Sequence, residues 1–261
     1  MDGEHTMSIV SSEYNKYVDD DHRKRHYINS CFCKDVIMIT LLAMNIGVII
    51  MIVYVFTNKD FYISKINDTI FKRIEGKSFN ENCTLPRDDL RYIHVLHVDI
   101  NNTVHEGEMI CNKYIAKTLI KIFKKLYEKK YPIEKMILID EYNAKDEKAM
   151  EDNDSSCFNC RFISYTNRIS KHGLGLAVDI NTLYNPYIKV VDNETTIQPE
   201  SGEKYVDRNQ SFIYKIEKND LCYKLFIENG FEWGGDWEDR KDYQHFELPD
   251  SKVNELYPMN K

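Results

Sequence analysis

One apolar run stands out from an otherwise mixed pattern of hydrophobic and polar positions. Residues 36–56 carry no charged side chain, and only Thr40, Asn45 and Gly47 interrupt their apolar character. A helix of this length rises about 30 Å, which is the hydrocarbon thickness of a bilayer. The run is too long and begins too late for a cleaved signal peptide. We therefore expect a transmembrane helix over residues 36–56.

The basic residues that flank this run predict its orientation. Arg23, Lys24, Arg25 and Lys34 precede it closely, whereas Lys59 and Lys65 follow it. By the positive-inside rule, we expect a single-pass protein with a cytoplasmic N-terminus and an exoplasmic C-terminal region. The sequence leaves open whether the membrane is that of a host cell or of a virion. Cys31 and Cys33 lie directly before the run, where they are either S-acylated or unmodified thiols.

Beyond the run, the hydrophobic pattern predicts an α+β domain. Residues 1–35 read as a polar tail, residues 57–90 as a stalk without clean periodicity, and residues 91–261 as the folded domain. Alternating or continuous apolar positions predict strands, and apolar positions three and four apart predict helices. The expected strands cover residues 92–99, 136–139, 176–180 and 244–248, the expected helices residues 111–130 and 220–228, and residues 141–160 read as a loop. These elements lack βαβ regularity, which favours an α+β arrangement.

Composition narrows the function classes. The chain has 42 acidic and 35 basic residues and a formal net charge of −7, which argues against a nucleic-acid partner. Five cysteines follow the apolar run: Cys83, Cys111, Cys157, Cys160 and Cys222. An exoplasmic location permits disulfides among them. Because five is an odd number, at least one stays free or pairs between chains.

Two of the eight histidines have neighbours suited to metal chemistry. His172 lies on a glycine-containing turn that leads into a predicted strand with Asp179, and His245 lies in a later strand. Two histidines and one carboxylate form the three-ligand set of a catalytic zinc site, which keeps a fourth position open. Asp242 is placed to act as a general base, and Glu247 to support a ligand. The alternative interpretation is an aromatic surface strand with incidental charges.

These residues lie in motifs that resemble a known family. Residues 170–179 read Ser-Lys-His-Gly-Leu-Gly-Leu-Ala-Val-Asp. This segment resembles the S-x-H-x-x-G-x-A-x-D signature of the D-alanyl-D-alanine carboxypeptidase and L-alanyl-D-glutamate endopeptidase family of zinc peptidases. Residues 230–237 and 241–247 resemble the second half of the same site, and the similarity spans roughly residues 91–250 in order. Residues 150–161 are more acidic than the corresponding segment in the branch of this family that the chain resembles.

The resemblance implies a Hedgehog/DD-peptidase-like fold with a central antiparallel sheet and flanking helices. It implies zinc as cofactor, with His172, Asp179 and His245 as ligands. It also implies Asp242 as the catalytic carboxylate, Arg161 as a residue that binds the substrate carbonyl or the developing oxyanion, and Ser170 as a hydrogen-bonding residue near the site. Trp233 and Trp237 either line the cleft or belong to the core.

Three functional hypotheses follow. The first is a membrane-anchored zinc peptidase that acts on D-amino-acid-containing peptides such as peptidoglycan stems, as a carboxypeptidase or an endopeptidase. The second is a Hedgehog-like binding module in which zinc is structural. The third is a cell-surface or virion scaffold that does not depend on zinc. A degenerate site would lose its general base, so the presence of Asp242 and Arg161 favours the enzyme.

Overall fold

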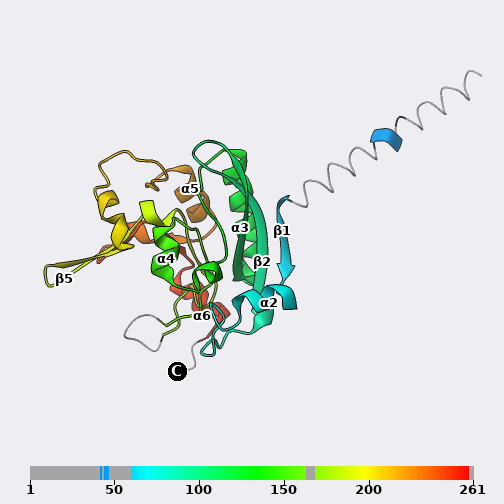
Figure 1. Ribbon diagram of the computed structural model, residues 1–261, viewed down its shortest axis with the longest axis horizontal. Helices are drawn as coiled ribbons and strands as arrows, with labels where there is room; N and C mark the ends of the chain where they lie inside the picture. Colours follow the sequence, from blue (N-terminus) through cyan, green and yellow to red (C-terminus); the bar gives the residue numbers. More distant parts are fainter. Residues whose placement is uncertain (1–41, 43, 47–59, 163–167, 259–261) are drawn as a thin grey trace, which may run out of the picture. The chain divides into compact units, whose positions relative to one another are not determined.

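The computed structural model describes residues 42, 44–46, 60–162 and 168–258 (Figure 1). The chain divides into two units, residues 1–57 and residues 58–261. The predicted tail over residues 1–35 and nearly all of the predicted transmembrane helix over residues 36–56 lie outside the described residues. Among the residues that are described, no helix combines the length and the apolar character needed to cross a bilayer. The membrane span stays a prediction.

The second unit begins with an antiparallel sheet that carries one long helix. Its strand order is β1 (Tyr62–Lys65), β2 (Leu90–Val98) and β3 (Val104–Asn112). β2 confirms the strand expected at residues 92–99. The helix α3 (Lys113–Glu128) starts two residues later than expected, because residues 111 and 112 complete β3. Asn112 then caps the helix, since its side chain accepts a hydrogen bond from the Tyr114 N–H at 3.1 Å.

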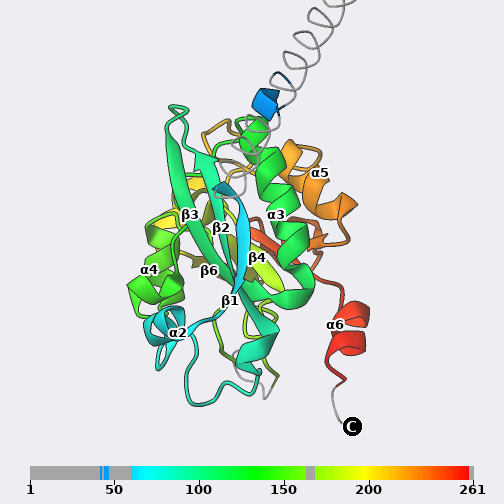
Figure 2. The same ribbon diagram turned by 90° about the vertical axis from the view of Figure 1, so that its right-hand side faces the viewer.

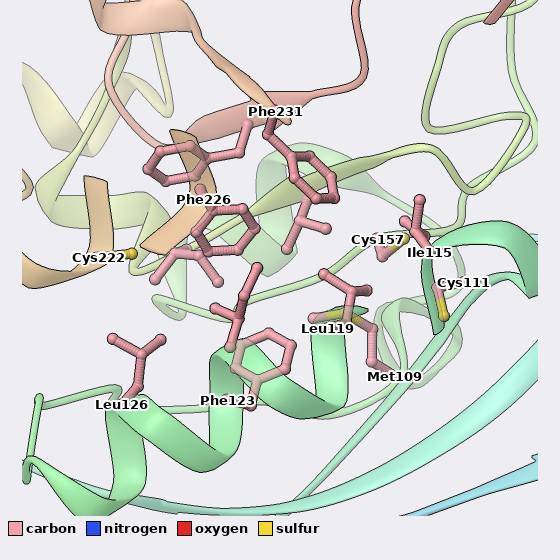
Figure 3. Packing of buried hydrophobic residues seen from close by; sticks show 14 of the residues in the cluster. Met109, Cys111, Ile115, Leu119, Phe123, Leu126, Cys157, Cys222, Phe226 and Phe231 are labelled. Carbon is pink, nitrogen blue, oxygen red and sulfur yellow. The ribbon is translucent and has the colours of Figure 1, made fainter. Parts of the chain in front are cut away.

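The main core forms where α3 meets α5 (Leu221–Glu228), and Figure 2 shows these two helices side by side. The predicted three- and four-residue spacing on α3 is confirmed, because Leu119, Phe123 and Leu126 are buried on one face. Figure 3 shows these side chains on the side of α3 that faces Phe226. The N-cap of α5 is Asp220, whose side chain accepts a hydrogen bond from the Tyr223 N–H.

Two further antiparallel sheets lie beyond this core. One has the order β4 (Ala177–Asp179), β9 (His245–Glu247) and β7 (Glu232–Trp233). The other has the order β6 (Glu194–Gln198), β5 (Tyr187–Val191) and β8 (Lys241–Asp242), and its β5–β6 hairpin projects from the body in Figure 1. The α+β class with antiparallel strands is therefore confirmed. Instead of one central sheet, the described residues form three sheets of three strands each.

Residues 60–90 belong to the folded unit, so the predicted stalk over residues 57–90 is wrong for them. β1 pairs with β2, and α2 (Asp68–Ile74) buries Ile74. Ile74 and Leu85 then pack with Phe158 and Cys160 in a second core cluster. Each element is too short to show a period in the sequence, and its apolar residues become contiguous only through tertiary packing.

Two other local predictions also differ from the structure. The strand expected at residues 136–139 does not form, because the pairing there is one isolated bridge between Lys135 and Asp154, followed by a 3₁₀ turn at Ile139–Tyr142. The expected loop over residues 141–160 contains α4 (Asp146–Glu151), and a last helix, α6 (Asp250–Leu256), was not predicted. Further 3₁₀ turns cover Arg87–Asp89, Thr182–Tyr184, Glu200–Tyr205 and Gly234–Asp236.

Candidate metal centre

Two short paired strands bring potential metal ligands together. The antiparallel register of β4 and β9 places Asp179 directly opposite His245. Because alternate residues of a strand face the same side, Glu247 shares this face with His245. The intervening residues Val178 and Phe246 are fully buried in the core. The alternation therefore puts the potential ligands on one face of the strand pair and the core residues on the other.

A tight turn before β4 carries His172. Gly175 adopts a φ of +64°, a conformation that favours glycine, and a Cβ there would lie 2.8 Å from the backbone nitrogen of Asn112. This close approach lets the Asn112 N–H donate to the Gly175 carbonyl at 2.8 Å. Within the turn, the His172 N–H donates to Ser170 Oγ at 3.2 Å. The turn is thus anchored to the end of β3, and Ser170 lies beside the site as expected.

One nitrogen of each histidine converges on the same carboxylate. His172 Nε2 lies 3.2 Å from Asp179 Oδ2, and His245 Nδ1 lies 2.9 Å from Asp179 Oδ1. The two ring nitrogens are 3.1 Å apart. In a tetrahedral zinc site with bonds of about 2.0 Å, ligand atoms lie roughly 3.3 Å apart. The three donors therefore have the spacing that a shared zinc ion requires.

The opposite ring nitrogens determine the tautomers. His172 Nδ1 lies 2.7 Å from the carbonyl oxygen of Cys157, and His245 Nε2 lies 2.9 Å from Glu247 Oε2. Both partners accept hydrogen bonds, so this network assigns a proton to each of these outer nitrogens. In the neutral rings, the inner nitrogens would then have lone pairs available for a shared cation. Histidines that bind metals are commonly oriented in this way.

The acidic side chains around the two histidine rings favour a positive charge between the inner ring nitrogens. Burial lowers the pKa of His245, but hydrogen bonds to Asp179 and Glu247 outweigh it and raise the pKa to about 10. Burial also opposes ionisation of Asp179, yet the neighbouring His172 and His245 hold its pKa well below its usual range. The donor types, their spacing and the surrounding charge all fit a zinc ion.

Asp242 lies on β8 and faces the same group of residues. Its Oδ1 is buried and has no hydrogen-bond partner within the described part of the chain. Burial raises the pKa of Asp242 to about 7, with His245 opposing the increase and Asp179 adding to it. Gly234 makes room for this strand, because a Cβ there would lie 2.6 Å from the Asp242 carbonyl oxygen. A carboxyl group of this kind is suited to accept and return a proton near neutral pH.

Glu247 is held by a residue that the sequence analysis did not single out. Lys171 Nζ lies 2.8 Å from Glu247 Oε1 and 2.6 Å from Asp250 Oδ1. Burial opposes ionisation of Glu247, but its hydrogen bonds with His245 and Lys171 lower its pKa to about 2. Glu247 thus holds the ring of His245, a candidate ligand. Lys171 occupies a variable position of the signature and reaches Glu247 only through the fold, so no spacing signal could have found it.

Arg161 and the two tryptophans take distinct positions. Arg161 lines the cleft, where its Nε lies 2.7 Å from Asp146 Oδ2 and its side chain is 41 % exposed. Trp237 also lines the cleft, with its ring centroid 5.4 Å from that of His245. Trp233 is buried in the core. The sequence left open whether the two tryptophans line the cleft or belong to the core. In the structure one tryptophan takes each position.

All the predicted site residues open onto one cleft of about 1210 Å³. Its lining includes Arg161, Ser170, His172, Asp179, Asp242 and His245. Pockets that enclose a single small ligand commonly measure about 300–1,000 Å³. The cleft therefore has room for a peptide of several residues to lie across the histidines.

These features define a class of site, in which a His-Asp-His set suited to a divalent metal lies beside a proton-accepting carboxyl group. Residues 164–248 match the family model described as D-alanyl-D-alanine carboxypeptidase. The match includes every ligand candidate and Asp242, and it confirms the family resemblance predicted from the sequence. It covers less than half of the chain and begins after Arg161. No curated protein and no solved structure matches the chain.

Proposed function

We propose that the chain is a membrane-anchored zinc peptidase that hydrolyses D-amino-acid-containing peptides of the peptidoglycan-stem type. The observation that carries this proposal is the convergence of His172, Asp179 and His245 beside Asp242, in a cleft of peptide size. The family match over the same residues supports the choice of peptide bonds as substrates.

In the proposed hydrolysis, each residue of the site would have a separate role. His172, Asp179 and His245 hold the zinc ion, which when bound acidifies water and polarises a carbonyl group as a Lewis acid. Asp242 accepts the proton of the attacking water at its unpaired Oδ1 and delivers it to the leaving amine. Arg161 donates hydrogen bonds to the substrate carbonyl oxygen as negative charge develops there. Its ion pair with Asp146 holds the side chain at the cleft wall.

The test uses the full-length chain loaded with zinc and a stem pentapeptide that ends in D-Ala-D-Ala. Mass spectrometry of the products separates a carboxypeptidase, which releases the terminal residue, from an endopeptidase, which releases a shorter peptide. We expect Asp242→Asn to lower turnover by about 10²–10⁴-fold. The matched control is Asp239→Asn, since the Asp239 side chain is 68 % exposed. Zinc-loaded protein that binds the peptide but never cleaves it would favour the Hedgehog-like binding module instead.

The membrane anchor is a separate part of the proposal. The apolar run over residues 36–56 and the four basic residues before it support a single span with a cytoplasmic N-terminus and an exoplasmic domain. The measurement is protease treatment of intact cells that express the full-length chain. Digestion of the domain without permeabilisation supports the topology. Release of the protein by alkaline extraction, or protection of the domain in intact cells, would contradict it.

A further inference from the structure

Two cysteines from distant parts of the sequence meet next to the cleft wall. Cys83 follows α2, and Cys160 directly precedes Arg161. The Cys160 N–H donates to the Ser78 carbonyl at 2.9 Å, and the Asn80 side-chain amide donates to the Cys160 carbonyl at 2.7 Å. The Cys83 N–H in turn donates to the Asn80 carbonyl at 3.0 Å. These contacts hold the two cysteine backbones close together.

The side chains of the pair also meet. Cys160 is buried in the second core cluster, Cys83 packs against it, and each thiol shifts the pKa of the other. The same two segments also carry Phe79 and Phe158, whose ring centroids lie 6.2 Å apart. A disulfide requires neighbouring sulfurs on backbones that need not move far, and the packing of both side chains in one cluster favours this pair.

The two thiols differ in reactivity. Cys83 is half-buried, and the hydrogen bond from Cys160 lowers its pKa, although its burial opposes this. The same hydrogen bond, together with burial, raises the pKa of Cys160. Cys111, Cys157 and Cys222 are almost wholly buried in the main core, and burial raises the pKa of each. Cys83 is thus the cysteine best placed to react with a molecule from solution.

We propose that Cys83 and Cys160 form an intramolecular disulfide through exchange with a small-molecule disulfide. The Cys83 thiolate attacks one sulfur of that molecule, which breaks its S–S bond and releases the first small thiol. Cys160 then loses its proton to solvent and attacks the Cys83 sulfur, which releases the second small thiol. The two protein thiols are oxidised, and the small disulfide is reduced to two thiols.

The disulfide would join two stretches of the cleft wall. Leu85 and Pro86, which follow Cys83 closely, line the cleft, as do Arg161 and Phe162, which follow Cys160. The bond would also close a long loop between residues 83 and 160, which restricts the unfolded chain. It would therefore stabilise the wall that carries Arg161. This inference concerns the fold of the cleft and stands whether or not the proposed hydrolysis occurs.

The experiment maps thiols in the full-length wild-type chain after incubation with oxidised glutathione. The protein is denatured, its free thiols are alkylated with N-ethylmaleimide, and its proteolytic peptides are analysed by mass spectrometry without reduction. We expect a linked pair of peptides containing Cys83 and Cys160, with the other three cysteines of the domain alkylated. Alkylation of both Cys83 and Cys160, or linkage of either to another cysteine, would overturn the proposal. This result requires no variant to fold.

A second measurement follows the melting temperature. Oxidised wild-type protein should melt on the order of 10 °C above reduced protein, given the length of the closed loop and the size of the unit. Cys83→Ser should abolish this difference, whereas the control Cys222→Ser should preserve it. An equal difference in wild type and Cys83→Ser would also overturn the proposal.

Discussion

Two histidine pairs in this protein have similar composition and ring spacing but different geometry. His97 and His105 lie directly opposite each other on β2 and β3, with ring centroids 5.3 Å apart. Asp99 Oδ2 lies 3.1 Å from His105 Nε2. His172 and His245 have ring centroids 5.0 Å apart and share Asp179. Residue types and ring spacing alone do not distinguish the two pairs.

The direction of the ring nitrogens does distinguish them. The planes of His97 and His105 lie 25° apart in a stack, and His97 Nδ1 contacts the Ile133 carbonyl at 2.8 Å. The planes of His172 and His245 lie 56° apart, and one nitrogen of each meets the same carboxylate. Within the described stretches, this second set is the group that brings three potential ligand atoms within 4.8 Å of one another. A turn, added to a pair of strands, supplies the convergence that two facing strands lack.

The largest expected difference between the pairs is in metal binding. His172→Ala should remove zinc from the purified chain and reduce peptide hydrolysis to background, because a three-donor set loses a ligand. The matched variant His105→Ala should keep both zinc and activity. Elemental analysis of both proteins gives the zinc content. Full zinc occupancy in His172→Ala would show that the metal, if present, lies elsewhere.

A substitution of Asp242 tests whether the site that contains His172 and His245 is catalytic or only binds metal. Asp242→Asn should lower turnover by about 10²–10⁴-fold, the usual contribution of a general acid–base group, while zinc content stays unchanged. The comparison of kcat with zinc stoichiometry separates the two effects. Loss of zinc in this variant would make Asp242 a ligand rather than a proton acceptor.

A smaller effect is expected at Glu247, which accepts a hydrogen bond from His245 and lies outside the proposed ligand set. Glu247→Gln should weaken zinc affinity by about 10–100-fold, because the His245 Nε2–H would lose a charged acceptor. Competition with a chelator measures this affinity. The control is Glu255→Gln, whose side chain is 65 % exposed and pairs with Lys252. Equal affinities in the two variants would mean that the hydrogen bond to Glu247 does not support the ligand.

The sequence predicted the site better than the fold that surrounds it. The ligand candidates and Asp242 fall in two short motifs, and the residue alternation of β4 and β9 already places Asp179 and His245 on strand faces. The helix α3 was also predicted correctly, because its hydrophobic periodicity extends over four turns. By contrast, the β5–β6 hairpin, α4 and the elements of residues 60–90 are short, and tertiary contacts decide their structure. The ion pair of Arg161 with Asp146 likewise depends on the position of α4.

The smallest expected effect concerns the first pair and the pH dependence of stability. Burial lowers the pKa of His97, with the Ile133 carbonyl and Asp99 favouring its protonation and His105 opposing it. The unfolded chain, in which the pKa returns to about 6.5, therefore binds more protons than the folded chain below that pH. Stability should be complete above about pH 6.5 and should decrease as the pH falls below it.

Melting temperatures at about pH 7.5 and pH 5.5 measure this decrease. In His97→Gln the decrease should be smaller than in the wild type, because the buried imidazole no longer has to remain uncharged. Both proteins retain His172 and His245, so the contribution of the metal-binding pair to the pH effect cancels in the comparison. An equal decrease in both proteins would show that burial of His97 does not govern acid stability. The first pair would then differ from the second in geometry but not in its response to pH.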